Sequence, residues 1–242
     1  MDLQELYAVI LLASLIHASF QLSVSMLTLL SSHTIGAKRS RARLFSLTSG
    51  FTGGAFFMTV LLLSVICLLL MTAFALAPPP IAWAVSSGLA MGVGIAVWVF
   101  YYRQDQGTTL WLPRSLARFL SERTRKTTLA AETFSLGLAS VVAEIVFIIA
   151  PLIIAGLTIC LLPADHQFPA ILLYAFVSSL PLIIVTMRVN AGRSLAAIQR
   201  WRENNKRFIQ FAAGSALMVL GFYLYVSEVS AVIQSIRLGL NG

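Results

Sequence analysis

Six long apolar stretches, separated by short polar gaps, are the feature that most limits how this chain can fold. Each is long enough to cross a bilayer, because a spanning helix needs about 20 mostly apolar residues. They run from Leu6 to Leu30, Leu44 to Leu76, Ile81 to Tyr102, Leu129 to Leu162, Phe168 to Met187 and Phe208 to Gln234. The second and fourth exceed one bilayer thickness and must tilt, kink or extend beyond it. Pro151 gives the fourth stretch a physical reason to kink.

The composition places the chain among membrane proteins. Of its 242 residues, 58% are hydrophobic and 11% are charged, whereas a soluble domain has about 25% charged residues. Strands of a membrane barrel alternate apolar and polar residues over about 10 positions, and these stretches do not alternate. We therefore expect an all-α, polytopic protein with six transmembrane helices, forming a single transmembrane domain over residues 1–242.

Positive charge is confined to every second gap between the apolar stretches. Sixteen of the 17 Lys and Arg residues lie in three segments: Lys38, Arg39, Arg41 and Arg43; Arg103, Arg114, Arg118, Arg123, Arg125 and Lys126; and Arg188, Arg193, Arg200, Arg202, Lys206 and Arg207. Basic residues beside membrane spans are retained in the cytoplasm. The pattern predicts six spans with both termini outside the cytoplasm.

The net charge of +8 follows the ends of the apolar stretches and forms no separate basic domain. We therefore expect contact with anionic lipid and no binding of nucleic acid. The N-terminus has no positive region before its apolar run, so it reads as a first span and not as a cleaved signal peptide.

Two inner loops have apolar residues at helical spacing. The segments Arg114–Arg123 and Arg193–Trp201 fit short interfacial helices with basic polar faces. Ordinary solvated connections remain the alternative. Either form could dock a protein partner in the cytoplasm.

The two halves of the chain could be inverted repeats. Residues 1–102 and 127–242 would each hold three spans, joined by the basic loop 103–126, and an odd number of spans gives the halves opposite orientations. Gly88 and Gly214 open similar segments, and they are almost as far apart as His17 and Glu144. Residues 49–54 and 176–181 also fall at matching offsets, although small residues favour helix packing in any membrane protein.

His17 and Gln21 belong to a polar face on the first apolar stretch. Helical spacings of three and four place these residues on one side, and such a side must face protein or water. Its members are Ser14, His17, Gln21, Ser25, Thr28 and Ser32. The face could line a polar path in which His17 exchanges a proton near neutral pH. Hydrogen bonds between helices are the structural alternative.

Glu144 is the most informative ionisable residue, because it lies near the middle of the fourth stretch. A carboxylate in hydrocarbon tends to hold a proton unless it is paired, which suits proton coupling or cation handling. Ser140 lies one turn earlier on the same face. Pro151 and Pro181 could expose backbone carbonyls within the membrane, as in the broken helices of transporters. These six residues form the predicted substrate or proton pathway.

No motif for a cofactor, a metal site or an enzyme is found. Cys67 and Cys160 lack metal-ligand spacing, and the sequence has no nucleophile elbow, HExxH, P-loop or dinucleotide fingerprint. We therefore expect no enzymatic activity and no transport driven by ATP on this chain alone.

The end of the chain resembles a known family. Residues 179–184, the run Ala191-Gly-Arg193, and residues 211–225 from Phe-Ala-Ala-Gly to Leu-Gly-Phe-Tyr-Leu-Tyr look like the last two spans of CcdA-type proteins. With six spans and a basic loop after the first, the chain resembles the LysE/CcdA (DsbD) superfamily of bacterial membrane transporters. The resemblance implies a location in the bacterial inner membrane and amino acids or metal ions as substrates.

The resemblance departs from the thiol-carrying branch, which has paired cysteines in the first and fourth spans. This first span has none, and Cys67 and Cys160 lie in the second and fourth. The leading hypothesis is a proton-coupled secondary transporter or exporter of a small solute or ion. The alternatives are a non-catalytic subunit or scaffold of a larger membrane complex, and a CcdA-like thiol-disulfide electron carrier.

Overall fold

The structure, a computed structural model, describes residues 1–21, 41–74, 78–102, 130–192 and 195–230. All regular elements in these ranges are helices. Several expectations fall outside them: the polar positions Ser25, Thr28 and Ser32, the end of the first stretch, the central loop with its segment Arg114–Arg123, and the last residues of the sixth stretch.

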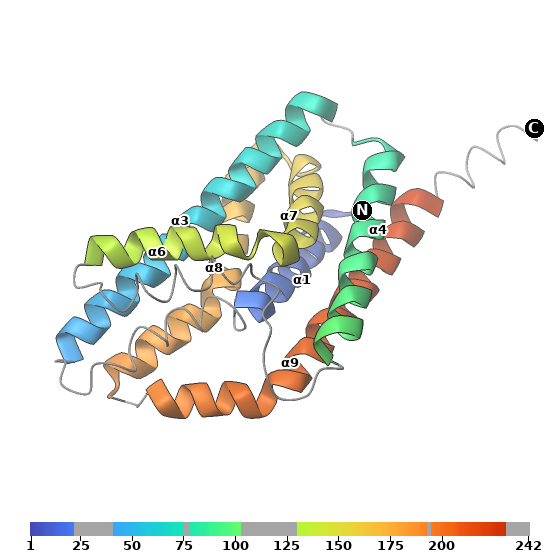
Figure 1. Cartoon of the computed structure of the whole chain (residues 1–242). Coiled ribbons are helices and arrows are strands. Elements are labelled where there is room, and N and C mark those ends of the chain that lie inside the picture. Colours follow the sequence, from blue (N-terminus) through green and yellow to red (C-terminus); the bar gives the residue numbers. More distant parts are fainter. Residues whose placement is uncertain (22–40, 75–77, 103–129, 193–194, 231–242) are drawn as a thin grey trace, which may run out of the picture.

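The helices follow the apolar stretches closely (Figure 1). They are α1 (Leu3–Gln21), α3 (Arg41–Phe74), α4 (Pro80–Ala96), α6 (Ala130–Ala143), α7 (Ile145–Cys160), α8 (Ala164–Asn190) and α9 (Leu195–Leu224), with π-helices η1 (Val97–Tyr102) and η2 (Tyr225–Ser230) after α4 and α9. In the described ranges, five spans are long and apolar enough to cross a membrane, and α6 with α7 would form one more as a bent pair. The chain is thus a helical membrane protein.

The outer surface is apolar, as contact with lipid requires. Large side chains such as Leu68, Phe208 and Phe222 are between 62% and 71% exposed. Several polar side chains point inward instead and are completely buried, among them Ser14, His17, Gln21, Thr59 and Glu144. This distribution is the reverse of that in a soluble protein.

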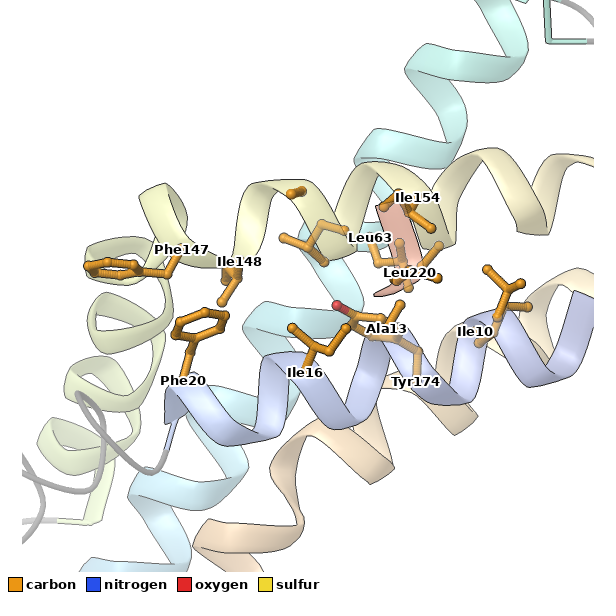
Figure 2. Close-up of a cluster of buried hydrophobic side chains, with 14 of the residues drawn as sticks. Ile10, Ala13, Ile16, Phe20, Leu63, Phe147, Ile148, Ile154, Tyr174 and Leu220 are labelled. Atoms are coloured by element: carbon orange, nitrogen blue, oxygen red, sulfur yellow. The ribbon is translucent and has the colours of Figure 1, made fainter. Parts of the chain in front are cut away.

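Helix α7 is the centre of the bundle. Twelve of its 16 residues are buried, and it contacts α1, α3, α4 and α8. A helix that is apolar on all sides is stable only when protein or lipid surrounds it. Figure 2 shows α1 running along α7, with Ile10, Ile16 and Phe20 facing the side of Ile148 and Ile154.

Helices α3 and α6 approach so closely that only glycine fits at their crossing. A Cβ atom at Gly54 would collide with the carbonyl oxygen of Phe134, and one at Gly137 would collide with that of Phe51. At Gly50 an added Cβ would lie 2.7 Å from the carbonyl oxygen of Ala130. Gly50 and Gly54 form a small-xxx-small pattern, which permits close backbone contact in membranes.

Helices α4 and α9 meet through a second glycine contact. A Cβ at Gly94 would lie 2.9 Å from the carbonyl oxygen of Gly214, and one at Gly221 would lie 2.9 Å from that of Ser87. Trp98, in η1, stacks on Phe211 with ring centroids 5.7 Å apart. The two helices therefore pack backbone to backbone along much of their length.

The fourth apolar stretch bends at Glu144 and not at Pro151, so the expected position of the kink is wrong. Helices α6 and α7 meet at 80°, and Glu144 between them has φ −86° and ψ −5°, in the sparsely populated bridge region. Pro151 lies inside α7. Proline is tolerated within membrane helices, because neighbouring groups satisfy the backbone that it frees.

The segment from Leu195 onward is helical, as its spacing predicted, and it continues into α9. In Figure 1 the first part of α9 lies across one end of the bundle, and the remainder turns to run along α4. The starts of α3 and α9 and the end of α8 gather at this end. These are helix ends that carry two of the three basic segments.

Gly137→Ala should destabilise the protein by roughly 1–3 kcal/mol, since its Cβ would overpack the backbone of α3. Gly88→Ala is the matched control, because a Cβ at Gly88 meets nothing within 4 Å; it should change stability by no more than about 1 kcal/mol. Thermal unfolding of the detergent-purified variants measures the difference. Equal stability of the two variants would contradict the close α3–α6 contact.

Candidate functional site

The polar face predicted on α1 points into the protein. Ser14, His17 and Gln21 are all completely buried, whereas Leu11 and Leu15 on the same helix are exposed. Spacings of three and four residues place the three polar side chains above one another on one side of the helix. This side faces α7 and α8, the helices that α1 contacts most extensively.

His17 is held by a tyrosine of α8. The Nδ1 atom of His17 lies 3.2 Å from the hydroxyl oxygen of Tyr174, and their rings are 5.7 Å apart between centroids. Both residues are completely buried. The Nε2 atom of His17 has no hydrogen-bond partner in the part of the chain that the structure describes.

Gln21 presents an amide to the interior at the end of α1. Neither its Oε1 nor its Nε2 atom has a hydrogen-bond partner among the described residues. A buried amide without a partner costs about 1–3 kcal/mol, so this position strongly favours a polar ligand. The amide can both donate and accept, as recognition of a small polar solute requires.

Glu144 forms the junction between α6 and α7. Its N–H donates to the carbonyl oxygens of Ser140 and Val141, at 3.2 and 3.1 Å, and its own carbonyl accepts from the N–H groups of Phe147 and Ile148, at 2.8 and 3.2 Å. The residue is completely buried. The backbone thus closes both helices on Glu144, and its carboxyl group lies at the first turn of α7, where the helix dipole favours negative charge.

An aromatic contact brings the end of α1 to this junction. Phe20 stacks on Phe147 with ring centroids 5.6 Å apart and an interplanar angle of 21°, and Figure 2 shows the two rings facing each other. Phe20 directly precedes Gln21, and Phe147 lies one helical turn after Glu144. The polar end of α1 and the bend therefore occupy the same level of the bundle.

The remaining predicted pathway residues have distinct surroundings. Ser140 is buried, and its hydroxyl donates to the carbonyl oxygen of Gly137 at 2.8 Å. Pro151 is buried within α7. Pro181 lies inside α8, on a groove wall away from the polar face of α1. The structure therefore groups His17, Gln21, Ser140 and Glu144 near the bend and separates Pro181 from them.

Sequence reasoning missed a second polar contact, between α3 and α8. The hydroxyl groups of Thr52 and Thr186 lie 3.0 Å apart, and Thr52 also donates to the carbonyl oxygen of Leu182 at 3.5 Å. It also missed Tyr174. Its position in an apolar span was a usable indication, because a buried tyrosine hydroxyl usually has a partner.

Cys67 in α3 and Cys160 in α7 are both buried free thiols. Their helices are in contact, and the Sγ atom of Cys67 would lie 4.0 Å from a Cβ added at Gly156, one turn before Cys160. The two cysteines therefore lie on facing helices away from the first span, and no disulfide joins them.

Comparison of the chain with protein-family models, with curated proteins and with solved structures finds no match.

Tyr174→Phe should destabilise the protein by about 1–3 kcal/mol, because it leaves buried His17 without the hydroxyl that contacts it. The same substitution at Tyr223, whose side chain is 41% exposed, serves as the control and should have an effect below about 0.5 kcal/mol. Thermal unfolding in detergent measures both variants. An equal effect at the two positions would show that the His17–Tyr174 contact contributes nothing.

Proposed function

We propose that the chain is a proton-coupled secondary transporter of a small solute or ion, with six spans arranged as two inverted repeats in a bacterial inner membrane. One observation carries the proposal. A buried glutamate forms the sharp bend of a broken helix, at the level where the polar face of α1 ends. Transporters with repeated halves place their sites at discontinuous helices near the membrane midplane.

A reciprocal glycine contact supports the inverted repeat. Gly221 follows Gly94 by 127 residues, and Gly214 follows Ser87 by the same number. The contact of Gly94 with the carbonyl oxygen of Gly214 therefore corresponds to the contact of Gly221 with that of Ser87, and both distances are 2.9 Å. A two-fold axis between α4 and α9 would generate one contact from the other.

Two further features have the same register. His17 and Glu144 are 127 residues apart, as are the stacked rings of Phe20 and Phe147. The π-helices η1 and η2 begin 128 residues apart, at Val97 and Tyr225. Because π-helices are rare, two of them at equivalent positions favour a duplicated fold over shared membrane composition.

The repeat would also explain where the candidate site lies. Equivalent residues that contact each other, such as Phe20 and Phe147, must lie close to the two-fold axis. In an inverted repeat this axis lies in the plane of the membrane. His17, Gln21 and Glu144 are within one turn of this pair along their helices, so all three would lie near the midplane.

The arrangement supports a defined chemical role for each residue. Glu144 would take up a proton when the site faces one side and release it when the site faces the other. Protonation changes the carboxyl group from an acceptor of cations into a hydrogen-bond donor, so proton and solute binding would exclude each other. His17 and Gln21 would offer nitrogen and amide groups to the solute.

Glu144→Gln should abolish solute-driven proton movement, because glutamine cannot exchange a proton. The measurement uses proteoliposomes with a pH-sensitive dye inside, to which a panel of amino acids and divalent cations is added. Glu132→Gln is the matched control, because Glu132 lies exposed on α6 and should retain full activity. Unchanged activity in the Glu144 variant, with a stoichiometric co-purified partner, would instead favour a scaffold.

Alkaline phosphatase fusions test the orientation. The enzyme is active only outside the cytoplasm, so fusions after Gly242 and at the N-terminus should be active. A fusion within residues 104–109 should be inactive, because this segment adjoins the central basic cluster and basic loops stay inside. Opposite activity of the two terminal fusions would rule out six spans and with them the inverted repeat.

A further inference from the structure

A groove on the side of the bundle belongs to neither the bend nor the polar face of α1. It encloses about 560 Å³, within the range of roughly 300–1,000 Å³ found for ligand sites. One wall is formed by residues of α1 and the other by residues of α8, with Trp201 of α9 near one end. The walls include Leu15, Ala18, Val177, Leu180, Pro181 and Ile184.

The groove is apolar along its walls and charged at one position. Among the described lining residues, only Arg188 is charged, and it lies in the last turn of α8. This turn belongs to the end of the bundle where α3 and α9 begin (Figure 1). An arginine near a helix end can lay its stem on apolar surface while its guanidinium stays at the membrane interface.

The groove opens toward the surrounding lipid. Leu15 on one wall is 53% exposed and Ile184 on the other is 49% exposed. Trp201 is 54% exposed and stands near the charged end, where tryptophan typically marks the level of the lipid headgroups. An occupant must therefore be a long apolar chain that ends in a negatively charged group at this level.

We infer that this groove binds an anionic glycerophospholipid, with one acyl chain between α1 and α8 and its phosphate on the guanidinium of Arg188. Guanidinium and phosphate form two parallel hydrogen bonds, which a zwitterionic headgroup weakens by placing its own cation beside the phosphate. The acyl chain fills the apolar walls without exposing them to water. The inference does not depend on transport activity.

Native mass spectrometry of the detergent-purified full chain tests the site. Phosphatidylglycerol and phosphatidylcholine with identical acyl chains are titrated separately, and the fraction of protein with one bound lipid is recorded. The wild type should prefer phosphatidylglycerol by about fivefold, the preference that one interfacial arginine supplies. Arg188→Gln should remove this preference.

Two matched variants separate the charge from the groove. Arg43→Gln removes one charge from the start of α3, outside the groove, and should keep the fivefold preference. Ala18→Trp fills the groove and should reduce binding of both lipids. Retention of the preference in Arg188→Gln, or normal lipid binding in Ala18→Trp, would overturn the inference.

Two other occupants give distinct results in the same experiment. If inorganic phosphate alone displaced phosphatidylglycerol, the headgroup contact would be the whole site and the acyl groove would be empty of specific lipid. A dimer that formed without lipid and was lost in Ala18→Trp would identify a second copy of the chain as the occupant. Either result would contradict a lipid site.

Discussion

The structure depends on one constraint, that a polar group within a membrane must face protein or water. The constraint turns the polar face of α1 inward, where Ser14, His17 and Gln21 lie against α7 and α8. It also makes α7, buried on most of its surface, the element around which the bundle packs. The only completely buried carboxylate among the described residues, Glu144, lies where α7 begins, so the centre of the fold and the centre of its chemistry coincide.

The sequence predicted the helices well and the break in the fourth stretch poorly. Apolar stretches of about 20 residues report span positions directly, because bilayer thickness sets helix length. The bend depends instead on packing between distant segments. Glycines of α3 and α6, Gly54 and Gly137, bring α6 close across α3, and α7 packs separately against α1. No local pattern at Glu144 encodes this divergence, whereas Pro151, which looked like a kink, stays in its helix.

The candidate site was predicted in part. His17, Gln21 and Glu144 stand out in the sequence because ionisable and amide groups are rare in apolar stretches. Their partners do not stand out. Tyr174 and Thr186 come from α8, more than 150 residues after α1, and only the packing of α8 against α1 and α3 reveals their roles. The 127-residue register could be read faintly from glycines and became persuasive only with the reciprocal contacts of α4 and α9.

The central claim is that Glu144, although buried, exchanges a proton with water. Infrared difference spectroscopy of the protein in lipid, recorded between acidic and alkaline buffer, observes this group directly. The account predicts a carbonyl band of a protonated carboxylic acid that rises as pH falls and is missing in Glu144→Gln. A spectrum without such a band, or with the same band in the variant, would contradict the claim.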